Sequence, residues 1–235
     1  MPTIGVDRDH LMTALGQSMT EEEFDELCFE FGLELDEVVK EDDGKTTYKI
    51  EVGANRYDLL CLEGLVRNLL IFQNKMKVPH YKSIKPKQPQ KLTIDSSTAS
   101  IRPHCLTTVL RGVKFTKATY DSFIDLQDKL HQNLARKRSL VAIGTHDLDK
   151  IQGPFKYVAQ PPNEIKFVPL NQAKEYTAVE LMDLYSTDSH LKAYLPIIKD
   201  SPVYPVIYDA NNVVLSMPPI INGNHSNKYP LCFGL

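Results

Sequence analysis

Cysteine is scarce in this sequence, and the few cysteines form no pattern. They lie at Cys28, Cys61, Cys105 and Cys232. No two are close enough for a CxxC metal site, and four over this length are too sparse for a disulfide framework. We therefore expect a protein of a reducing compartment.

Long apolar runs and a strong charge excess are also absent. No stretch approaches the roughly 18 apolar residues of a membrane span, and the opening MPTIGVDRDHL resembles neither a signal peptide nor a transit peptide. We expect a soluble cytoplasmic chain with no membrane partner. The net charge of −3 argues against a surface that coats nucleic acid generally, so any RNA contact should be local.

The common catalytic motifs are missing as well. The sequence contains no G-x-x-x-x-G-K-[ST], no G-x-G-x-x-G, no G-x-S-x-G and no paired-histidine zinc helix. Nothing therefore supports an ATP-hydrolysing, dinucleotide-binding or triad enzyme. The catalytic residues stay unassigned, and we expect no metal site.

The composition that is present suits a folded protein of one large or two small domains. Apolar residues make up 42% of the 235, which is ample for a core. The Lys/Pro/Gln-rich stretch 79–91 is the clearest linker candidate, and we divide the chain around it.

Local signals predict several elements on each side of that linker. Thr20 and Glu23 form a capping box for a helix that Gly32 ends, and Asp58 suits the N-cap of a helix over 59–74. The remaining expected helices are 9–16, 119–138, 177–185 and 191–199, and the expected strands are 3–6, 33–38, 48–52, 91–94, 106–115, 140–144 and 155–158.

The most informative stretch is 203–222, VYPVIYDANNVVLSMPPIIN. Two β-rich runs flank a DANN turn, which predicts a hairpin over 206–215. Pro218 and Pro219 then break the second run, because proline cannot donate to a ladder. An apolar loop stiffened by proline is suited to a preformed pocket wall, and the alternative is a strand that ends in a buried structural loop.

Three polar groups each allow two interpretations. In 145–149, THDLD, the histidine and carboxylates could bind a ligand, or the aspartates could only hold a tight turn. Arg136, Lys137 and Arg138 are candidate RNA contacts, or they are a solvated helix end that favours the helix dipole. In 55–58, NRYD, the arginine could bind a ligand, or it could pair with a carboxylate at a helix entry.

Four blocks of this sequence resemble the cytosolic, eukaryotic-type phenylalanyl-tRNA synthetase β subunit in its N-terminal portion. They are EEEFDELCFEFGLELDE at 21–37, ANRYDLLCLEGL at 54–65, VAIGTHDLD at 141–149 and LSMPPIING at 215–223. The resemblance runs from residue 1 to about 226. It implies an α+β fold, with a small α+β domain over 1–85 and a B3/B4-type editing domain over 86–226, a mixed sheet flanked by helices.

The resemblance also implies a function. The family's B3/B4 domain hydrolyses tyrosine mistakenly attached to tRNA(Phe), within an α2β2 tetramer whose α subunit holds phenylalanine and ATP. We expect no cofactor in this part of the subunit, and ATP and Mg²⁺ in the whole synthetase. By resemblance, Ile207 and Ser216 line the side-chain pocket, Pro218 and Asn222 lie beside them, and Thr145 and His146 sit at its rim.

The sequence departs from the family after Ser226. Residues 227–235, NKYPLCFGL, form a divergent tail where the family continues with further domains. We therefore expect an incomplete editing domain, with no neighbour for the strand at 213–215, and a chain that does not charge tRNA by itself. The alternative is a non-catalytic interaction or regulatory module that retains only the fold.

Overall fold

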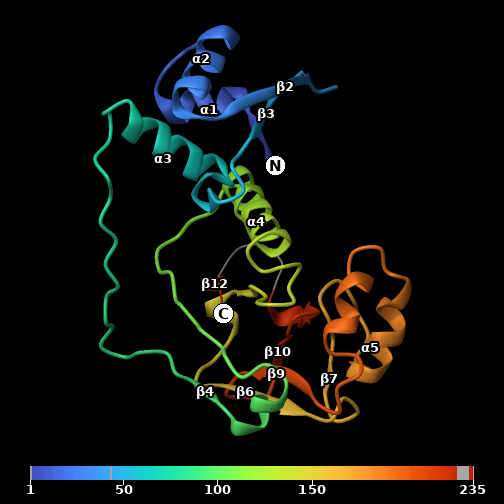
Figure 1. Cartoon of the computed structure of the whole chain (residues 1–235). Helices are drawn as coiled ribbons and strands as arrows, with labels where there is room; N and C mark the ends of the chain where they lie inside the picture. Colours follow the sequence, from blue (N-terminus) through green and yellow to red (C-terminus); the bar gives the residue numbers. More distant parts are fainter. Residues whose placement is uncertain (1, 43, 227–232, 235) are drawn as a thin grey trace. The chain divides into compact units, whose positions relative to one another are not determined.

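The computed structural model describes residues 2–42, 44–226 and 233–234. The chain divides into two compact units, Met1–Ser83 with Lys117–Leu130, and Ile84–Thr116 with His131–Leu235 (Figure 1). Residues 79–91, the expected linker, contain no helix or strand and are almost all exposed. The first unit also takes in most of a later helix, which a single cut near residue 85 did not anticipate.

The first unit is a three-stranded antiparallel sheet, in the order β1-β3-β2, packed with helices. Its elements are β1 (Thr3–Asp7), α1 (Arg8–Leu15), α2 (Glu21–Phe31), β2 (Glu34–Lys40), β3 (Thr46–Glu51), the 3₁₀ turn η1 (Tyr57–Leu59), α3 (Leu62–Phe72) and most of α4 (Lys117–Gln132). The core lies between sheet and helices, with Phe24 stacked on Tyr48 at 5.1 Å between ring centroids. Leu126 and Leu130 of α4 pack against this core, which explains why the helix belongs here.

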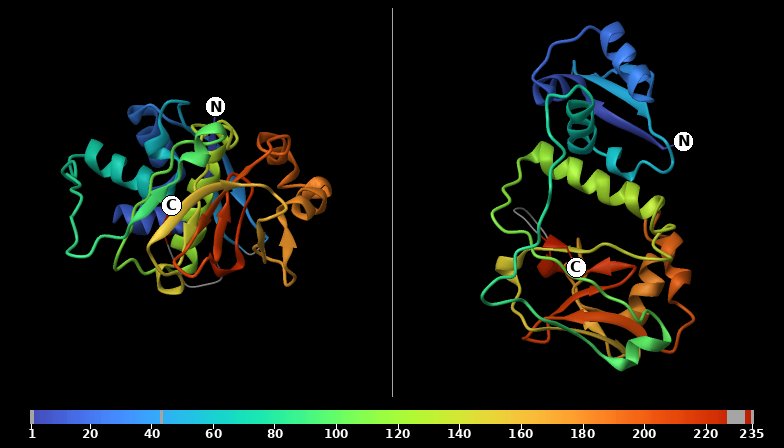
Figure 2. Two further views of the ribbon diagram at one scale, coloured as in Figure 1. Left: turned by 90° about the horizontal axis from the view of Figure 1, so that it is seen from below. Right: turned by 60° about the vertical axis from the view of Figure 1, so that its left-hand side comes forward.

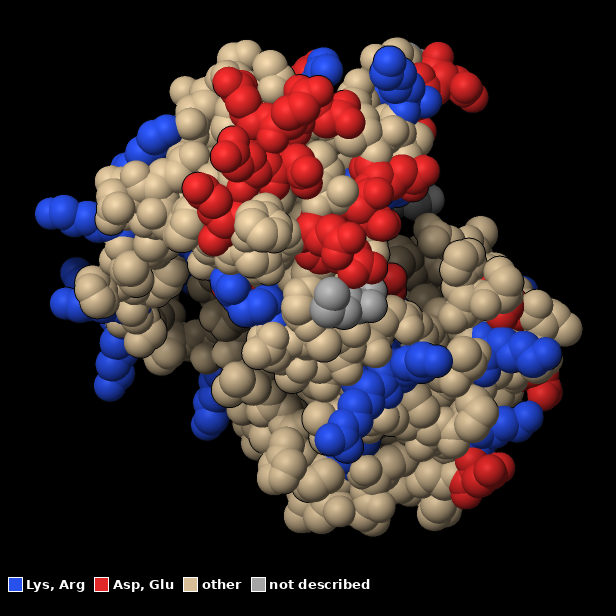
Figure 3. Space-filling model, turned by 45° about the horizontal axis from the view of Figure 1, so that its top comes forward, with Lys and Arg blue, Asp and Glu red and all other residues tan. Residues whose placement is uncertain are grey.

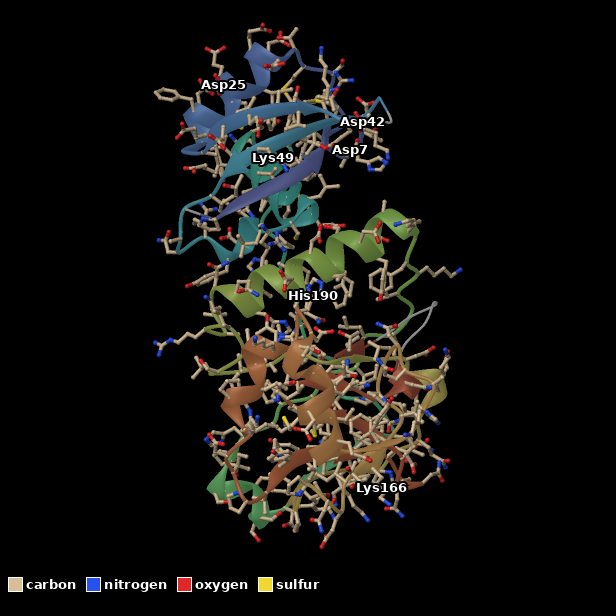
Figure 4. The ribbon with its side chains drawn as sticks, turned by 90° about the vertical axis from the view of Figure 1, so that its right-hand side faces the viewer. Asp7, Asp25, Asp42, Lys49, Lys166 and His190 are labelled. Atoms are coloured by element: carbon tan, nitrogen blue, oxygen red, sulfur yellow. The ribbon has the colours of Figure 1, made fainter. Side chains whose placement is uncertain are left out.

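Capping residues set the helix limits in this unit. The Asp7 carboxylate accepts a hydrogen bond from the His10 backbone N–H and caps α1 (Figure 4). The predicted capping box of Thr20 and Glu23 is present, and Gly32 ends α2 with φ of 88°, so both predictions are confirmed.

The predicted N-cap at Asp58 is wrong. Asp58 lies in η1 and pairs with Arg56 at 2.9 Å, and this hydrogen bond lowers the pKa of the Asp58 carboxyl. The cap of α3 is instead Cys61, whose Sγ accepts from the Gly64 N–H at 3.4 Å. The ion-pair interpretation of the 55–58 motif is therefore the correct one.

The second unit is built on a mixed five-stranded sheet in the order β11-β10-β9-β6-β4, where only β4 and β6 are parallel (Figure 2). Its elements are β4 (Leu92–Ile94), η2 (Ser96–Ser100), the end of α4, β5 (Thr145–His146), η3 (Leu148–Lys150), β6 (Phe155–Gln160), β7 (Lys166–Phe167), β8 (Tyr176–Thr177), α5 (Ala178–Leu184), η4 (Tyr185–Thr187), η5 (Lys192–Ile197), β9 (Tyr204–Tyr208), β10 (Val214–Met217), β11 (Ile221–Asn222), η6 (Asn224–Ser226) and β12 (Phe233–Gly234). The expected α+β class with a mixed sheet flanked by helices is confirmed.

The two faces of this sheet bury different clusters. On one face Val206, Val214 and Met217 pack with α5, η4 and η5 through Leu181 and Leu195. The other face carries a smaller cluster, which consists of Phe155, Tyr157, Ile207 and Leu215.

Two predicted strands are absent, and the helix predicted over 119–138 is shorter than predicted. Residues 106–115 form no strand, and Leu106 is 90% exposed. Residues 140–144 form none either, because side chains take the backbone groups that a ladder would use. The guanidinium of Arg102 donates to the carbonyls of Ser139 and Leu140, and the Ile143 N–H donates to His131 Nε2 at 2.8 Å. The helix predicted over 119–138 ends at Gln132.

The expectation of an unpaired strand at 213–215 is also wrong. β10 pairs with β9 on one side and with β11 on the other, since the chain turns at Pro218 and Pro219 and returns antiparallel. The tail prediction concerns 227–232 and 235, which lie outside the described residues, while β12 pairs with β5 through its backbone. No helix in the described residues is long and apolar enough to cross a membrane.

Candidate functional site

Three of the six predicted pocket residues lie in one row across the sheet of the second unit. Ser216 on β10 is the register partner of Ile207 on β9 and of Asn222 on β11. Directly paired residues of antiparallel strands point to the same face. Ile207 and Ser216 are buried, and Asn222 is partly buried at the edge.

A tight hairpin fixes this row. The Asp209 carboxylate accepts from the N–H groups of Asn211 and Val213, and Asn212 adopts φ of 59°, so the DANN segment forms the predicted turn. The register shifts between Val214 and Ser216. A bulge of this kind turns a side chain out of strict alternation, and here it sets Ser216 opposite Ile207.

Gly144 brings a second group to the same edge. A Cβ on Gly144 would lie 3.4 Å from Asn222 Oδ1 and 3.5 Å from His146 Nε2. The side chains of Asn222 and His146 therefore converge on one small residue. Sequence patterns missed Gly144, and its position directly before Thr145-His146 was the only available signal.

His146 is the most unusual group at this site. Its side chain has no solvent exposure, and neither ring nitrogen has a hydrogen-bond partner within the described part of the chain. Burial lowers the pKa of His146 to about 4, so the imidazole is neutral at pH 7. A buried polar group without a partner costs free energy, and such groups often serve a ligand.

A pocket opens beside His146. Its other lining residues come from the linker end, an irregular segment and the sheet, namely Gln90, Lys91, Leu92, Thr107, Thr108, Val109, Leu148, Ile151 and Phe155. Of the six predicted residues, only His146 lines it. Thr145 precedes His146 in β5, and Pro218 lies in the turn after β10. The structure thus joins Ile207, Ser216 and Asn222 in one row, with His146 and Asn222 both close to Gly144, and does not enclose all six in one cavity.

The two aspartates of the THDLD segment differ in role. The Asp147 carboxylate accepts from the Asp149 N–H at 3.0 Å and lies 3.8 Å from Lys150 Nζ. Asp149 is exposed. Asp147 thus has the turn-forming role that was the alternative to ligand binding. In the described residues, no group of three or more His, Cys, Asp or Glu side chains could hold a metal ion.

The basic group 136–138 is not a helix end. Arg136, Lys137 and Arg138 follow α4 in a left-handed turn, with φ of 49°, 53° and 63°. Arg136 and Lys137 are exposed, whereas Arg138 is half-buried and contacts the chain after β10. The dipole interpretation is therefore wrong, and the three residues separate into two exposed cations and one packed cation.

Charge is divided unequally between the two units. The first unit contains 11 Lys and Arg against 20 Asp and Glu, a net charge of −9, and the second contains 16 against 10, a net charge of +6. Acidic side chains gather over one region of the surface in Figure 3. Three of the first unit's acidic residues, Glu21, Glu22 and Glu23, lie in the first turn of α2. A polyanion would be attracted to the second unit rather than the first.

The fold and the sequence define the class of this protein. The family model described as the B3/4 domain matches residues 96–228, and the model described as the Phe-tRNA synthetase beta subunit B1 domain matches residues 1–75. The chain belongs to the phenylalanyl-tRNA synthetase β-subunit family, and its two matched regions are the B1 domain and the B3/4 domain.

Individual relatives agree with this membership. The chain is 61% identical to the phenylalanine–tRNA ligase beta subunit of Mus musculus and 53% identical to the cytoplasmic one of Arabidopsis thaliana, and 96% of the chain is covered in each comparison. It spans about two fifths (41%) of the length of either relative. A crystal structure of an N-terminal fragment of the β subunit from Pyrococcus horikoshii matches with a TM-score of 0.87 and 31% identity, over 97% of this chain and 65% of that one.

Proposed function

We propose that this chain acts as part of the β subunit of a phenylalanine–tRNA ligase in the cytoplasm. In this role it supports the synthesis of phenylalanyl-tRNA together with an α subunit, in an α2β2 assembly, and with tRNA(Phe). ATP and Mg²⁺ belong to the whole synthetase, with ATP at the α subunit. The high identity to β subunits from animals and plants supports this assignment.

We further propose that the second unit hydrolyses tyrosine from mischarged tRNA(Phe). The observation that carries this proposal is the row of Ile207, Ser216 and Asn222, beside a buried and unpartnered His146. The row and His146 together join an apolar surface for an aromatic ring to three groups that can form hydrogen bonds. Tyrosine differs from phenylalanine only by one hydroxyl, so a site that hydrogen-bonds that hydroxyl rejects phenylalanine by leaving its own polar groups unpaired.

The same geometry limits the chemistry. Hydrolysis adds water to the tyrosyl carbonyl and returns the ribose oxygen as a hydroxyl, so a proton must leave the water. With a pKa of about 4, His146 is a weak general base at pH 7 and is better suited to hydrogen bonding with the substrate. We therefore assign the activation of water to backbone donors and the terminal ribose hydroxyl of the tRNA.

Contacts with tRNA are proposed for the second unit. Its net charge of +6 favours a polyanion, whereas the charge of −9 on the first unit opposes one. Arg136 and Lys137 are exposed in the left-handed turn and remain the RNA-contact candidates. Their substitution should weaken tRNA binding and reduce its salt dependence, with no change in the choice between tyrosine and phenylalanine.

Deacylation of tyrosyl-tRNA(Phe) by the full 235-residue chain tests the editing proposal. We expect faster release of tyrosine than of phenylalanine from the matched phenylalanyl-tRNA(Phe), and loss of that preference in Ser216→Ala. Equal release rates, or no release above the uncatalysed rate with and without the α subunit, would contradict it. The second result would favour a non-catalytic interaction module.

A further inference from the structure

The left-handed turn after α4 has an unusual backbone conformation. Three consecutive non-glycine residues, Arg136, Lys137 and Arg138, have positive φ. L-residues adopt this region rarely, and they stay there only when their surroundings hold them. The turn is held at both ends, because Ala135 is buried and accepts from the Leu140 N–H, and the Ser139 hydroxyl donates to the Arg136 carbonyl at 2.7 Å.

This conformation directs the guanidinium of Arg138 to the chain between β10 and β11. The Nη1 of Arg138 donates to the carbonyls of Pro219 and Ile220, each at 3.4 Å. The guanidinium carbon also lies 4.2 Å from the centroid of the Tyr194 ring, in cation–π contact. The Tyr194 hydroxyl is fixed in turn by the Gln132 side chain at 3.1 Å. Arg138 thus joins the end of α4, the η5 segment and the proline turn.

The proline turn leads directly to the proposed pocket. Only Ile221 separates Ile220 from Asn222, and β11 has only two residues, so its register depends on the turn before it. The carbonyl of Asn222 accepts from the Leu170 N–H at 2.9 Å, and the Gly223 N–H donates to the Leu215 carbonyl at 2.7 Å. A turn that shifts would move the Asn222 side chain away from Gly144 and His146.

We propose that Arg138 is a positioning residue of this site, which holds the proline turn so that Asn222 stays aligned with Ser216. The inference rests on the proposed editing function for its substrate, and on the contacts of Arg138 for its geometry. Arg138 thus has a different role from its neighbours Arg136 and Lys137, whose side chains are exposed to solvent. A planar guanidinium suits this place because one group stacks on the ring and donates to two carbonyls, whereas a lysine ammonium is a point charge on a flexible stem.

Four variants of the full chain test the proposal, namely Arg138→Met, Arg138→Lys, and the matched controls Arg136→Met and Arg136→Lys. The first readout is hydrolysis of small tyrosyl and phenylalanyl esters, which lack the RNA. We expect Arg138→Met to lower the tyrosyl preference in kcat/KM by about tenfold, and Arg138→Lys to restore part of it. The Arg136 variants are the reference for the tRNA-affinity and hydrogen-exchange readouts.

The second readout is the affinity for uncharged tRNA(Phe) as a function of salt. A positioning residue leaves the affinity and its salt slope unchanged, whereas a phosphate contact lowers both. We expect no change for the Arg138 variants and a lower affinity for the Arg136 variants. Weaker tRNA binding by Arg138→Lys with an intact ester preference would overturn the proposal.

Hydrogen exchange gives a third readout that needs no activity. The amides of Leu170 and Gly223 report on β11, and we expect Arg138→Met to raise their exchange rates while Arg136→Met does not. Arg138→Lys serves the same purpose if Arg138→Met fails to fold. If the wild-type chain hydrolyses neither ester, the editing proposal fails alone. Unchanged exchange at both amides in Arg138→Lys and Arg138→Met would overturn the positioning role.

Discussion

Replacing Ser216 by alanine should separate recognition from stability. Ser216 is 4% exposed and lies in the central strand β10. The substitution removes one small polar atom and keeps the volume of the side chain nearly the same. We expect the free energy of unfolding to change by less than about 0.5 kcal/mol, as for substitutions that break no named interaction.

The effect on recognition should be larger. If the Ser216 hydroxyl pairs with the tyrosyl hydroxyl, the loss of that bond in a buried site costs about 1–3 kcal/mol in the transition state. Since about 1.4 kcal/mol is a factor of ten, the tyrosyl preference should fall roughly 5- to 150-fold. Hydrolysis of phenylalanyl and tyrosyl esters under single-turnover conditions measures this ratio, and urea unfolding measures the stability.

Ser97→Ala is the matched control, because it should lower stability and leave the ester preference unchanged. The Ser97 hydroxyl accepts from the Ala159 N–H at 3.0 Å, and this serine lies on η2, away from the row. Its removal leaves a backbone donor unpaired and should cost about 1 kcal/mol of stability, with no change in ester preference. An unchanged ratio in Ser216→Ala, or equal losses with both esters, would remove Ser216 from recognition.

Three further predictions concern stability and protection. Thr20→Ala removes the capping box of α2 and should lower the free energy of unfolding by about 1 kcal/mol, measured by urea titration, whereas an effect near zero would show that the cap is not needed. The pKa of His146 is about 4 in the folded state against an ordinary value of 6.5, so folding favours the neutral imidazole, and its contribution to stability is complete above pH 6.5 and is lost as the pH falls toward 4. The free energy of unfolding should therefore fall less between pH 7 and 5 in His146→Asn than in the wild-type chain. Equal losses in the two proteins would contradict the burial of a neutral imidazole. Hydrogen exchange should find residues 204–208 and 214–217 better protected than 140–144, because β9 and β10 are central strands and 140–144 form no strand. An unpaired strand at 213–215 would give the reverse order. Faster exchange in β9 and β10 than in 140–144 would contradict the observed strand order of the sheet.

Local chemistry explains which parts of the fold could be predicted from the sequence. The capping box at Thr20 and Glu23, the left-handed Gly32 and the DANN hairpin each depend on residues within a few positions of one another. Such interactions form wherever the right side chains occur at the right spacing. They fixed the limits of α2 and the turn between β9 and β10.

The errors share one physical cause, which is that a strand needs a partner from elsewhere in the chain. Residues 106–115 and 140–144 are β-rich, yet neither forms a strand in the structure. Arg102 and His131 take the backbone groups at 139–143 instead, and no local pattern indicates those long-range contacts.

In the candidate site too, features set by nearby residues could be predicted from the sequence, and long-range contacts could not. Ser216 and Asn222 belong to one recognisable motif, but their pairing depends on the chain turning at the prolines, and sequence patterns did not predict it. The approach of Gly144 and His146 to Asn222 joins segments that are almost 80 residues apart, and it came only from the structure. Sequence patterns also grouped Arg138 with Arg136 and Lys137, because nothing local distinguishes a packed arginine from its exposed neighbours.

The release of tyrosine from tyrosyl-tRNA(Phe), compared with phenylalanine from phenylalanyl-tRNA(Phe), tests the central claim most directly. The measurement uses the full chain with and without an α subunit, and the Ser216→Ala variant beside it. We expect a clear preference for the tyrosyl substrate, which Ser216→Ala reduces while the chain stays folded. Equal rates on the two substrates, or a preference that Ser216→Ala leaves intact, would contradict the assignment of the row of Ile207, Ser216 and Asn222 as an editing pocket.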